Sequence, residues 1–161
     1  MTDFGALIQA LCTSEVRFVL VGGVAATLHG SARLTQDVDI VYARDAENLG
    51  RIARALASLR PYLRGAPPGL PFNLDTQTLV AGFNFTLTTS AGDIDLLGEI
   101  AGAGSYDALI GHTIEVDLFG ARCRCLDLPT LIAAKIASGR PKDLEAIAEL
   151  RALLDERSPE S

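Results

Sequence analysis

Two aspartates separated by one residue are the most informative chemical feature of this 161-residue sequence. Asp37 and Asp39 belong to an apolar, β-branched run that continues to Tyr42. On a β-strand, residues two apart project from the same face, about 6.7 Å apart. Two carboxylates would repel each other there, and a hard divalent cation such as Mg²⁺ removes the repulsion because it prefers oxygen ligands. The pair predicts a cation site, with a charged, solvent-facing edge strand as the alternative.

A third carboxylate is offered by residues 92–97, a segment that is also typical of a strand. Asp93 and Asp95 would share one face of it; we favour Asp95 because apolar residues flank it on both sides. Carboxylates on neighbouring strands are the donor set of a two-metal phosphoryl-transfer centre. One ion activates the attacking hydroxyl and the other neutralises the triphosphate. A turn acid at Asp93 and an exposed acid at Asp95 are the alternative.

Two glycines and one lysine could contact the phosphates of such a substrate. Gly22 and Gly23 separate an expected strand from an expected helix, where they permit a sharp turn and close approach of a ligand. The N–H groups at the start of that helix favour a phosphate, although a plain tight turn is the alternative. Lys135 is the only charged residue between positions 128 and 138, and a triphosphate is a suitable counter-charge for it. A lysine extending from the helix flank into solvent is the alternative.

The elements that must position these residues follow from hydrophobic periodicity and from the turn residues between them. Residues 60–75 carry four prolines and two glycines and are expected to form a loop. Helices are expected over residues 3–14, 24–29, 46–59, 128–138 and 142–154. Strands are expected over residues 16–21, 38–42, 83–88, 93–97, 112–119 and 122–126. This order predicts an α/β (α+β) fold, with a mixed sheet flanked by helices and two helices at the C-terminal end.

The length and composition predict one globular domain over residues 1–156 and a disordered tail over residues 157–161. The formal net charge of −6 argues against a general DNA-binding module. It does not exclude an enzyme whose metal ions bring a polyanion to a carboxylate site. No apolar run approaches the roughly 20 residues that span a bilayer, and the sequence shows no signal peptide, so we expect a cytoplasmic protein without membrane contact. Cys12, Cys123 and Cys125 are expected to be free thiols.

These motifs together resemble the nucleotidyltransferase superfamily of the polymerase-β type. The resemblance rests on Gly-Gly after an apolar run, on Arg33-Leu34-Thr35-Gln36-Asp37-Val38-Asp39-Ile40, and on a later acid between apolar residues. The segments 128–135 and 140–147 are similar to the AbiEii/MenT group of nucleotidyltransferase-like proteins, which includes toxins of bacterial toxin-antitoxin and phage-defence systems. The resemblance extends over residues 18–154.

The resemblance implies a role for each matching position. It implies that the two glycines hold the triphosphate, that Asp37, Asp39 and Asp95 are the catalytic acids and metal ligands, and that two Mg²⁺ ions serve an NTP substrate. It further implies a nucleotide-binding set, in which simple alternatives remain open: bracing of the Asp pair for Arg33 and Thr35, a first-turn helix acid for Asp143, and surface salt bridges for Arg140 and Lys142. That set is Gly22, Gly23, Arg33, Thr35, Lys135, Arg140, Lys142 and Asp143. Gly23 departs from the Gly-Ser of many superfamily members, so a hydroxyl contact to phosphate is missing.

The sequence thus predicts a Mg²⁺-dependent nucleotidyltransferase that transfers an NMP from an NTP to an acceptor hydroxyl. RNA, tRNA or a small molecule could be the acceptor, and an antitoxin protein could be a partner. The alternative is a non-catalytic nucleotide-binding or regulatory protein that retains the fold.

Overall fold

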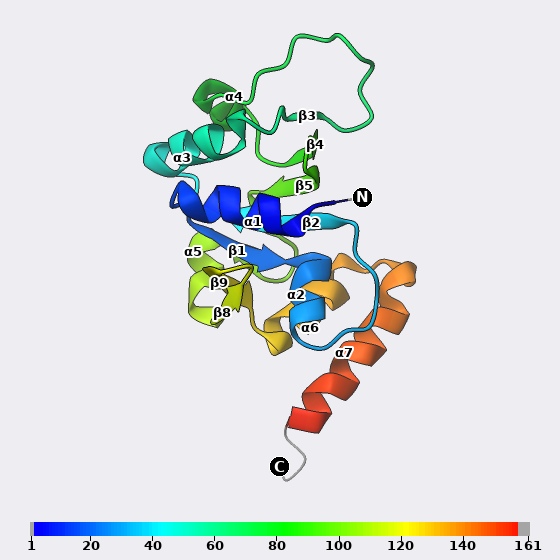
Figure 1. Ribbon diagram of the computed structural model, residues 1–161. Helices are drawn as coiled ribbons and strands as arrows, with labels where there is room; N and C mark the ends of the chain where they lie inside the picture. Colours follow the sequence, from blue (N-terminus) through cyan, green and yellow to red (C-terminus); the bar gives the residue numbers. More distant parts are fainter. Residues whose placement is uncertain (1, 158–161) are drawn as a thin grey trace.

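The computed structural model describes residues 2–157, in which a seven-stranded mixed sheet forms the centre of the fold (Figure 1). The strand order is β3-β4-β5-β2-β1-β9-β8; β1 runs parallel to β9, and β2 parallel to β5. The sheet strands are β1 (Phe18–Val21), β2 (Asp37–Tyr42), β3 (Tyr62–Leu63), β4 (Phe85–Thr89), β5 (Gly92–Leu97), β8 (Thr113–Leu118) and β9 (Ala121–Leu126). The strands β6 (Glu99–Ile100) and β7 (Gly104–Ser105) form a separate two-stranded hairpin.

Helices pack around this sheet, as the predicted fold class requires. The helices are α1 (Phe4–Thr13), α2 (Gly22–Leu28), α3 (Ala46–Ala57), α4 (Thr76–Ala81), α5 (Tyr106–Leu109), α6 (Leu128–Ser138) and α7 (Leu144–Arg157), with short 3₁₀ turns over Ile110–His112 and Pro141–Asp143. Helix α1 packs against α3 and the sheet, and α2, α6 and α7 gather beyond the C-terminal end of β1 (Figure 1). The α/β fold with two joined C-terminal helices is confirmed.

The first four residues of the strand that carries the first acid pair separate polar from apolar residues by alternation. Val38 and Ile40 are fully buried in the hydrophobic core, whereas Asp37 and Asp39 are half-buried on the opposite face. The same alternation holds in β5, where Ile94 and its neighbour Leu96 are fully buried. Burial of these apolar side chains fixes the register of both strands, because a slip by one residue would drive the carboxylates into the core. The hydrophobic core therefore orients the acids.

Helix α6 begins and ends where its sequence signals place it. The side chain of Asp127 accepts a hydrogen bond from the Thr130 N–H at 2.9 Å, and Pro129 lies in the first turn. Gly139 ends the helix in the left-handed conformation with φ of 65°. These caps fix the helix that carries Lys135.

The segments rich in glycine and proline contain more structure than expected. The expected loop 60–75 includes β3, which pairs with β4, and the unexpected helix α4 follows it. The glycine-rich link after β5 forms the β6–β7 hairpin and is followed by α5. Helix α2 begins at Gly22 rather than at position 24, and α7 extends to Arg157, the first residue of the expected tail. Residues 158–161 of that tail lie outside the described residues.

Two further expectations concern the whole chain. All three cysteines are free thiols, as predicted, with Cys12 Sγ 3.6 Å from Cys123 Sγ. Among residues 2–157, no helix combines the length and the apolar character needed to cross a bilayer.

Candidate active site

The parallel pairing of β2 with β5 assembles the acids into two rows. Asp39 lies opposite Asp95, and Asp37 lies opposite Asp93. Carboxylate oxygens of Asp37, Asp39 and Asp95 lie within 4.8 Å of one another. Strand β1 lies on the other side of β2, where Val21, the residue before Gly22, pairs with Asp39. The Gly-Gly turn therefore begins beside the row formed by Asp39 and Asp95. Pairing between distant segments therefore brings the two acidic motifs together.

The structure distinguishes the two acids of β5. Asp95 belongs to the three-carboxylate cluster, and its side chain is 22% exposed. The Asp93 side chain is 38% exposed and lines a cavity with Thr35 and Ser90 on the other side of the acid row. The geometry groups Asp95, the acid favoured from its apolar flanks, with the first pair, and its role as the third metal ligand stays a prediction.

The close carboxylates disturb one another's protonation. Burial, together with the charges of Asp37 and Asp95, raises the pKa of Asp39 to about 8. Burial and the charge of Asp95 also raise the pKa of Asp37, an effect that Arg64 opposes. In the protein without a cation, part of the negative charge is therefore removed by bound protons.

The donor atoms of the cluster fit a hard cation. Asp39 Oδ1 and Asp95 Oδ1 are buried and accept no hydrogen bond within residues 2–157, although Arg64 Nη2 lies 2.8 Å from Asp95 Oδ1. Buried oxygens without partners are costly, and coordination to a divalent cation would satisfy them. An all-carboxylate set suits Mg²⁺ or Mn²⁺ rather than a soft metal. Asp37, Asp39 and Asp95 are the residues that would hold the ion.

Both glycines of the Gly-Gly turn are required by close packing against the acid motif. A Cβ added to Gly22, whose φ is +64°, would lie 2.1 Å from Asp39 Oδ2. A Cβ added to Gly23 would lie 2.4 Å from Thr35 Oγ1. The Thr35 hydroxyl donates to the Asp37 carbonyl at 3.2 Å and occupies the space into which a side chain at position 23 would project. This contact is a physical reason for the departure from Gly-Ser noted in the sequence.

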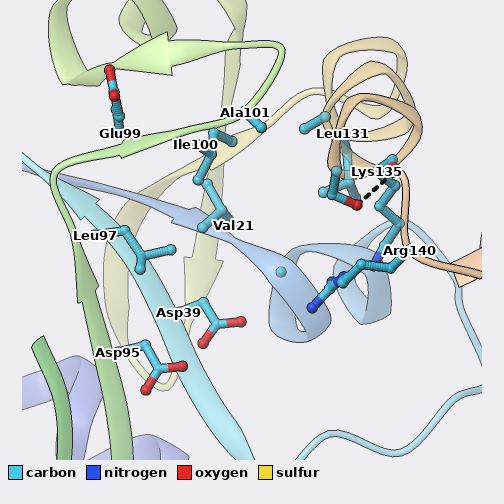
Figure 2. Close-up of a pocket in the computed structure, with 13 residues that line it drawn as sticks. Val21, Asp39, Asp95, Leu97, Glu99, Ile100, Ala101, Leu131, Lys135 and Arg140 are labelled. Carbon is cyan, nitrogen blue, oxygen red and sulfur yellow. Dashed lines mark hydrogen bonds between the residues drawn. The ribbon is translucent and has the colours of Figure 1, made fainter. Parts of the chain in front are cut away.

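A cavity of about 380 Å³ opens beside the acids (Figure 2). Asp39 and Asp95 point toward it from adjacent strands, and Lys135 and Arg140 lie across it (Figure 2). Its apolar residues are Val21, Leu97, Ile100, Ala101, Leu131 and Ala134. Carboxylates thus face two basic side chains across a space of mixed polar and apolar lining, an arrangement that can accept a metal-bound polyphosphate with an attached aromatic ring.

Comparison with known proteins connects this geometry with a family. The family model described as "Nucleotidyl transferase AbiEii toxin, Type IV TA system" matches residues 7–144. This chain belongs to the AbiEii family. A solved structure of a proposed nucleotidyltransferase from Thermotoga maritima is also similar, with a TM-score of 0.54 and 19% identity over 93% of this chain and 89% of that chain. At this identity the likeness shows the fold alone. A comparison with curated proteins finds no match.

The basic residues of the AbiEii cavity already have a partner in the protein. Lys135 Nζ lies 3.9 Å from Asp143 Oδ1, and Arg140 Nε donates to Asp143 Oδ2 at 2.7 Å. Asp143 is 7% exposed. Burial would raise its pKa, but the Arg140 hydrogen bond and the charge of Lys135 outweigh burial and lower it. Asp143 thus supplies the counter-charge for Lys135 that the sequence had suggested for a triphosphate, and it orients both cations at the cavity wall.

The remaining predicted site residues gather around a second, smaller cavity of about 180 Å³. Gly23, Arg33, Thr35 and Lys142 line it, and Lys135 borders both cavities. Arg33 also forms ion pairs with two glutamates of α7, at 3.2 and 3.7 Å, so it joins the loop before β2 to that helix. The predicted site residues therefore line two neighbouring cavities, one of which contains the acids, rather than one common cavity.

One residue of the acid cluster was not predicted from the sequence. Arg64, immediately after β3, lies 2.8 Å from Asp95, 3.4 Å from Asp93 and 3.8 Å from Asp37. It lies in the segment interpreted as a loop, and a two-residue strand provides no periodic signal. No motif in the sequence marks this arginine.

The raised pKa values predict that the metal-free protein loses stability as the pH rises from 5 to 7. The folded state holds the Asp39 proton up to about pH 8, whereas the unfolded chain releases it near 3.8, so the proton favours folding most below that lower value. The loss is at most about 1.4 kcal/mol per pH unit for one such group. Urea unfolding in EDTA measures it.

The Asp39→Asn variant is the control for this pH dependence. It cannot ionise at this position, so its unfolding free energy should vary less between pH 5 and 7 than that of the wild type. An identical slope in both proteins would contradict the assignment of the proton to Asp39.

Proposed function

We propose that this AbiEii-family protein is a Mg²⁺-dependent nucleotidyltransferase that transfers an NMP from an NTP to a hydroxyl acceptor on RNA, tRNA or a small molecule. The observation that carries the proposal is the three-carboxylate cluster, of which Asp39 and Asp95 line a cavity that Lys135 and Arg140 also line. The family match supports the transferase class. The type IV toxin-antitoxin system in the family's description supports an antitoxin as partner.

The side chains would act mainly through position and charge. Asp37, Asp39 and Asp95 would hold two Mg²⁺ ions, which supply charge neutralisation of the triphosphate and a lower pKa for the attacking hydroxyl. Loading the site with cations requires Asp39 to release its proton. Lys135 and Arg140 would contact phosphate oxygens across the cavity, while Asp143 keeps them oriented. Asp95 would assist the removal of the acceptor proton.

A labelling experiment tests the proposal. Purified protein is incubated with each of the four α-labelled nucleoside triphosphates, Mg²⁺ and either total bacterial RNA or a small-molecule extract. We expect label in an acceptor with at least one nucleotide, and none after addition of EDTA or with Asp39→Asn. Metal-dependent nucleotide binding without transfer would instead support the non-catalytic alternative. If the protein shows neither transfer nor metal-dependent nucleotide binding, both the proposed function and the non-catalytic alternative are contradicted.

The two lysines of the chain provide a matched pair of variants for the phosphate contact. Lys135 is 18% exposed and borders the acid-lined cavity, whereas Lys142 lines only the second cavity. We expect Lys135→Ala to raise the KM for NTP by about 10- to 100-fold, as for loss of a charge-assisted hydrogen bond, with a smaller effect from Lys142→Ala. Steady-state kinetics measures this; a larger KM effect at Lys142 would place the phosphates in the second cavity.

A further inference from the structure

The guanidinium group of Arg64 reaches the acid cluster from the edge of the sheet. Its backbone N–H donates to the Thr86 carbonyl at 3.0 Å, and Thr86 pairs with Asp95 across β4 and β5. From that edge the side chain extends over β4 to three carboxylates, at distances of 2.8, 3.4 and 3.8 Å. Arg64 is therefore a positive charge within reach of the oxygens that would hold a metal ion.

The hydrogen bonds of this guanidinium go to the backbone rather than to the acids. Arg64 Nη2 donates to the carbonyls of Leu87 and Ile94, at 2.7 and 3.4 Å. Although Nη2 lies 2.8 Å from Asp95 Oδ1, that oxygen accepts no hydrogen bond within residues 2–157, and Arg64 Nε donates none there. A structural arginine–carboxylate pair typically forms two parallel hydrogen bonds. Arg64 instead pairs with the acids through charge, without directed hydrogen bonds to them, so a divalent ion that neutralises the acids would take over its role.

Its position in the fold also permits separation. β3 is a two-residue strand at the sheet edge, and the side chain of Arg64 is 28% exposed. The next residue, Gly65, is exposed and has φ of +83°, and the exposed prolines 67 and 68 follow. A change of rotamer would move the guanidinium toward solvent without opening the hydrophobic core, at the cost of its hydrogen bonds to the Leu87 and Ile94 carbonyls.

We propose that Arg64 is a displaceable internal counter-cation of the acid cluster, with which a divalent cation competes for Asp37 and Asp95. One guanidinium facing these acids and Asp93 leaves the cluster negative enough to attract a divalent ion, yet lowers its repulsion in the metal-free protein. The inference rests on the proposed function, because it takes the acid cluster to be the metal site. It makes Arg64 a positioning residue that tunes metal affinity.

A permanent role of Arg64 in the metal-loaded site predicts the opposite effect of its removal on metal affinity. If Arg64 were a permanent part of the loaded site, holding the ligands in place or contacting phosphate, its removal would weaken metal binding. If it competes with the ion, its removal strengthens binding and destabilises the metal-free protein, whose carboxylates then lack their counter-charge. Metal affinity and metal-free stability together separate the two roles without an activity assay.

Mn²⁺ binding to the full chain, measured by calorimetry and by electron paramagnetic resonance of the free ion, tests the inference. We expect Arg64→Gln to bind Mn²⁺ about tenfold more tightly than the wild type, or more. Arg64→Lys keeps the charge and should stay near the wild type. Arg54→Gln, at an exposed arginine of α3, is the matched control and should leave the affinity unchanged.

Thermal unfolding provides the second readout. We expect Arg64→Gln to lower Tm in EDTA, and saturating Mn²⁺ to remove most of that difference. Weaker or unchanged Mn²⁺ binding in Arg64→Gln would overturn the inference and leave the metal site intact. If Arg64→Gln does not fold, equal Mn²⁺ affinity in wild type and Arg64→Ala would overturn it as well. No Mn²⁺ binding by any folded variant would overturn both the inference and the metal site of the proposed function.

Discussion

Replacing Asp95 with asparagine is expected to lower kcat/KM for nucleotidyl transfer by about 10³-fold or more, as loss of a group that acts in the transition state does. Asp95 shares the cluster with Asp37 and Asp39, and its buried Oδ1 accepts no hydrogen bond within residues 2–157, although it lies 2.8 Å from Arg64. Asparagine keeps the shape but would remove the charge proposed to hold the ion and the base proposed to assist the acceptor. Steady-state transfer assays with labelled NTP and a fixed acceptor measure the loss.

Asp93→Asn is the most informative comparison for that variant. The two acids are two residues apart on the same strand and face Arg64 alike, but Asp93 is outside the three-carboxylate cluster. We expect less than about a tenfold loss from it, the effect of a changed local field rather than a lost ligand. Asp155→Asn, on the exposed side of α7, controls for charge alone. A larger loss at Asp93 than at Asp95 would exchange their roles.

The acid motifs could be predicted from the sequence because their signal is local. A period of two along a strand, with apolar residues between the acids, places Asp37 and Asp39 on one face of their strand and Asp95 on the face of its strand opposite Ile94 and Leu96. Their convergence is a property of the sheet, since β2 pairs in parallel with a strand more than fifty residues away. The expectation that the two acidic strands lie side by side therefore depends on the family resemblance, because periodicity within each strand does not show which strands pair.

Other parts of the site depend on contacts that leave no local signal. Arg64 reaches the cluster from a two-residue edge strand, and nothing in its neighbours distinguishes it from a loop arginine. Asp143 was expected as a helix acid or as part of a family motif, yet the fold buries it against Lys135 and Arg140. Short elements such as α4 were missed for the same reason, because six residues carry too little periodicity.

Gly22 packs so closely against the Asp39 carboxylate that a side chain at position 22 should affect both stability and metal binding. Replacing Gly22 with alanine is expected to reduce the free energy of unfolding by about 2–4 kcal/mol, from left-handed backbone strain and from overpacking. The new Cβ would meet Asp39 Oδ2 at 2.1 Å, with the backbone at φ of +64°. Because relief of this contact displaces a proposed metal ligand, the surviving folded protein should also bind Mn²⁺ more weakly. Urea unfolding in EDTA and Mn²⁺ titration measure the two effects.

The chain contains a matched glycine whose replacement should have the opposite effect. Gly50 lies inside α3, and a Cβ there would meet Arg54 at 3.6 Å, an ordinary contact. Gly50→Ala is therefore expected to stabilise the protein by about 0.5–1 kcal/mol through helix propensity, with Mn²⁺ affinity unchanged. If Gly22→Ala were as stable as Gly50→Ala, the turn would not be held against Asp39. The Gly-Gly motif would then serve only the approach of a ligand. The close packing of Gly22 against Asp39 instead indicates that glycine is needed to place the Asp39 carboxylate.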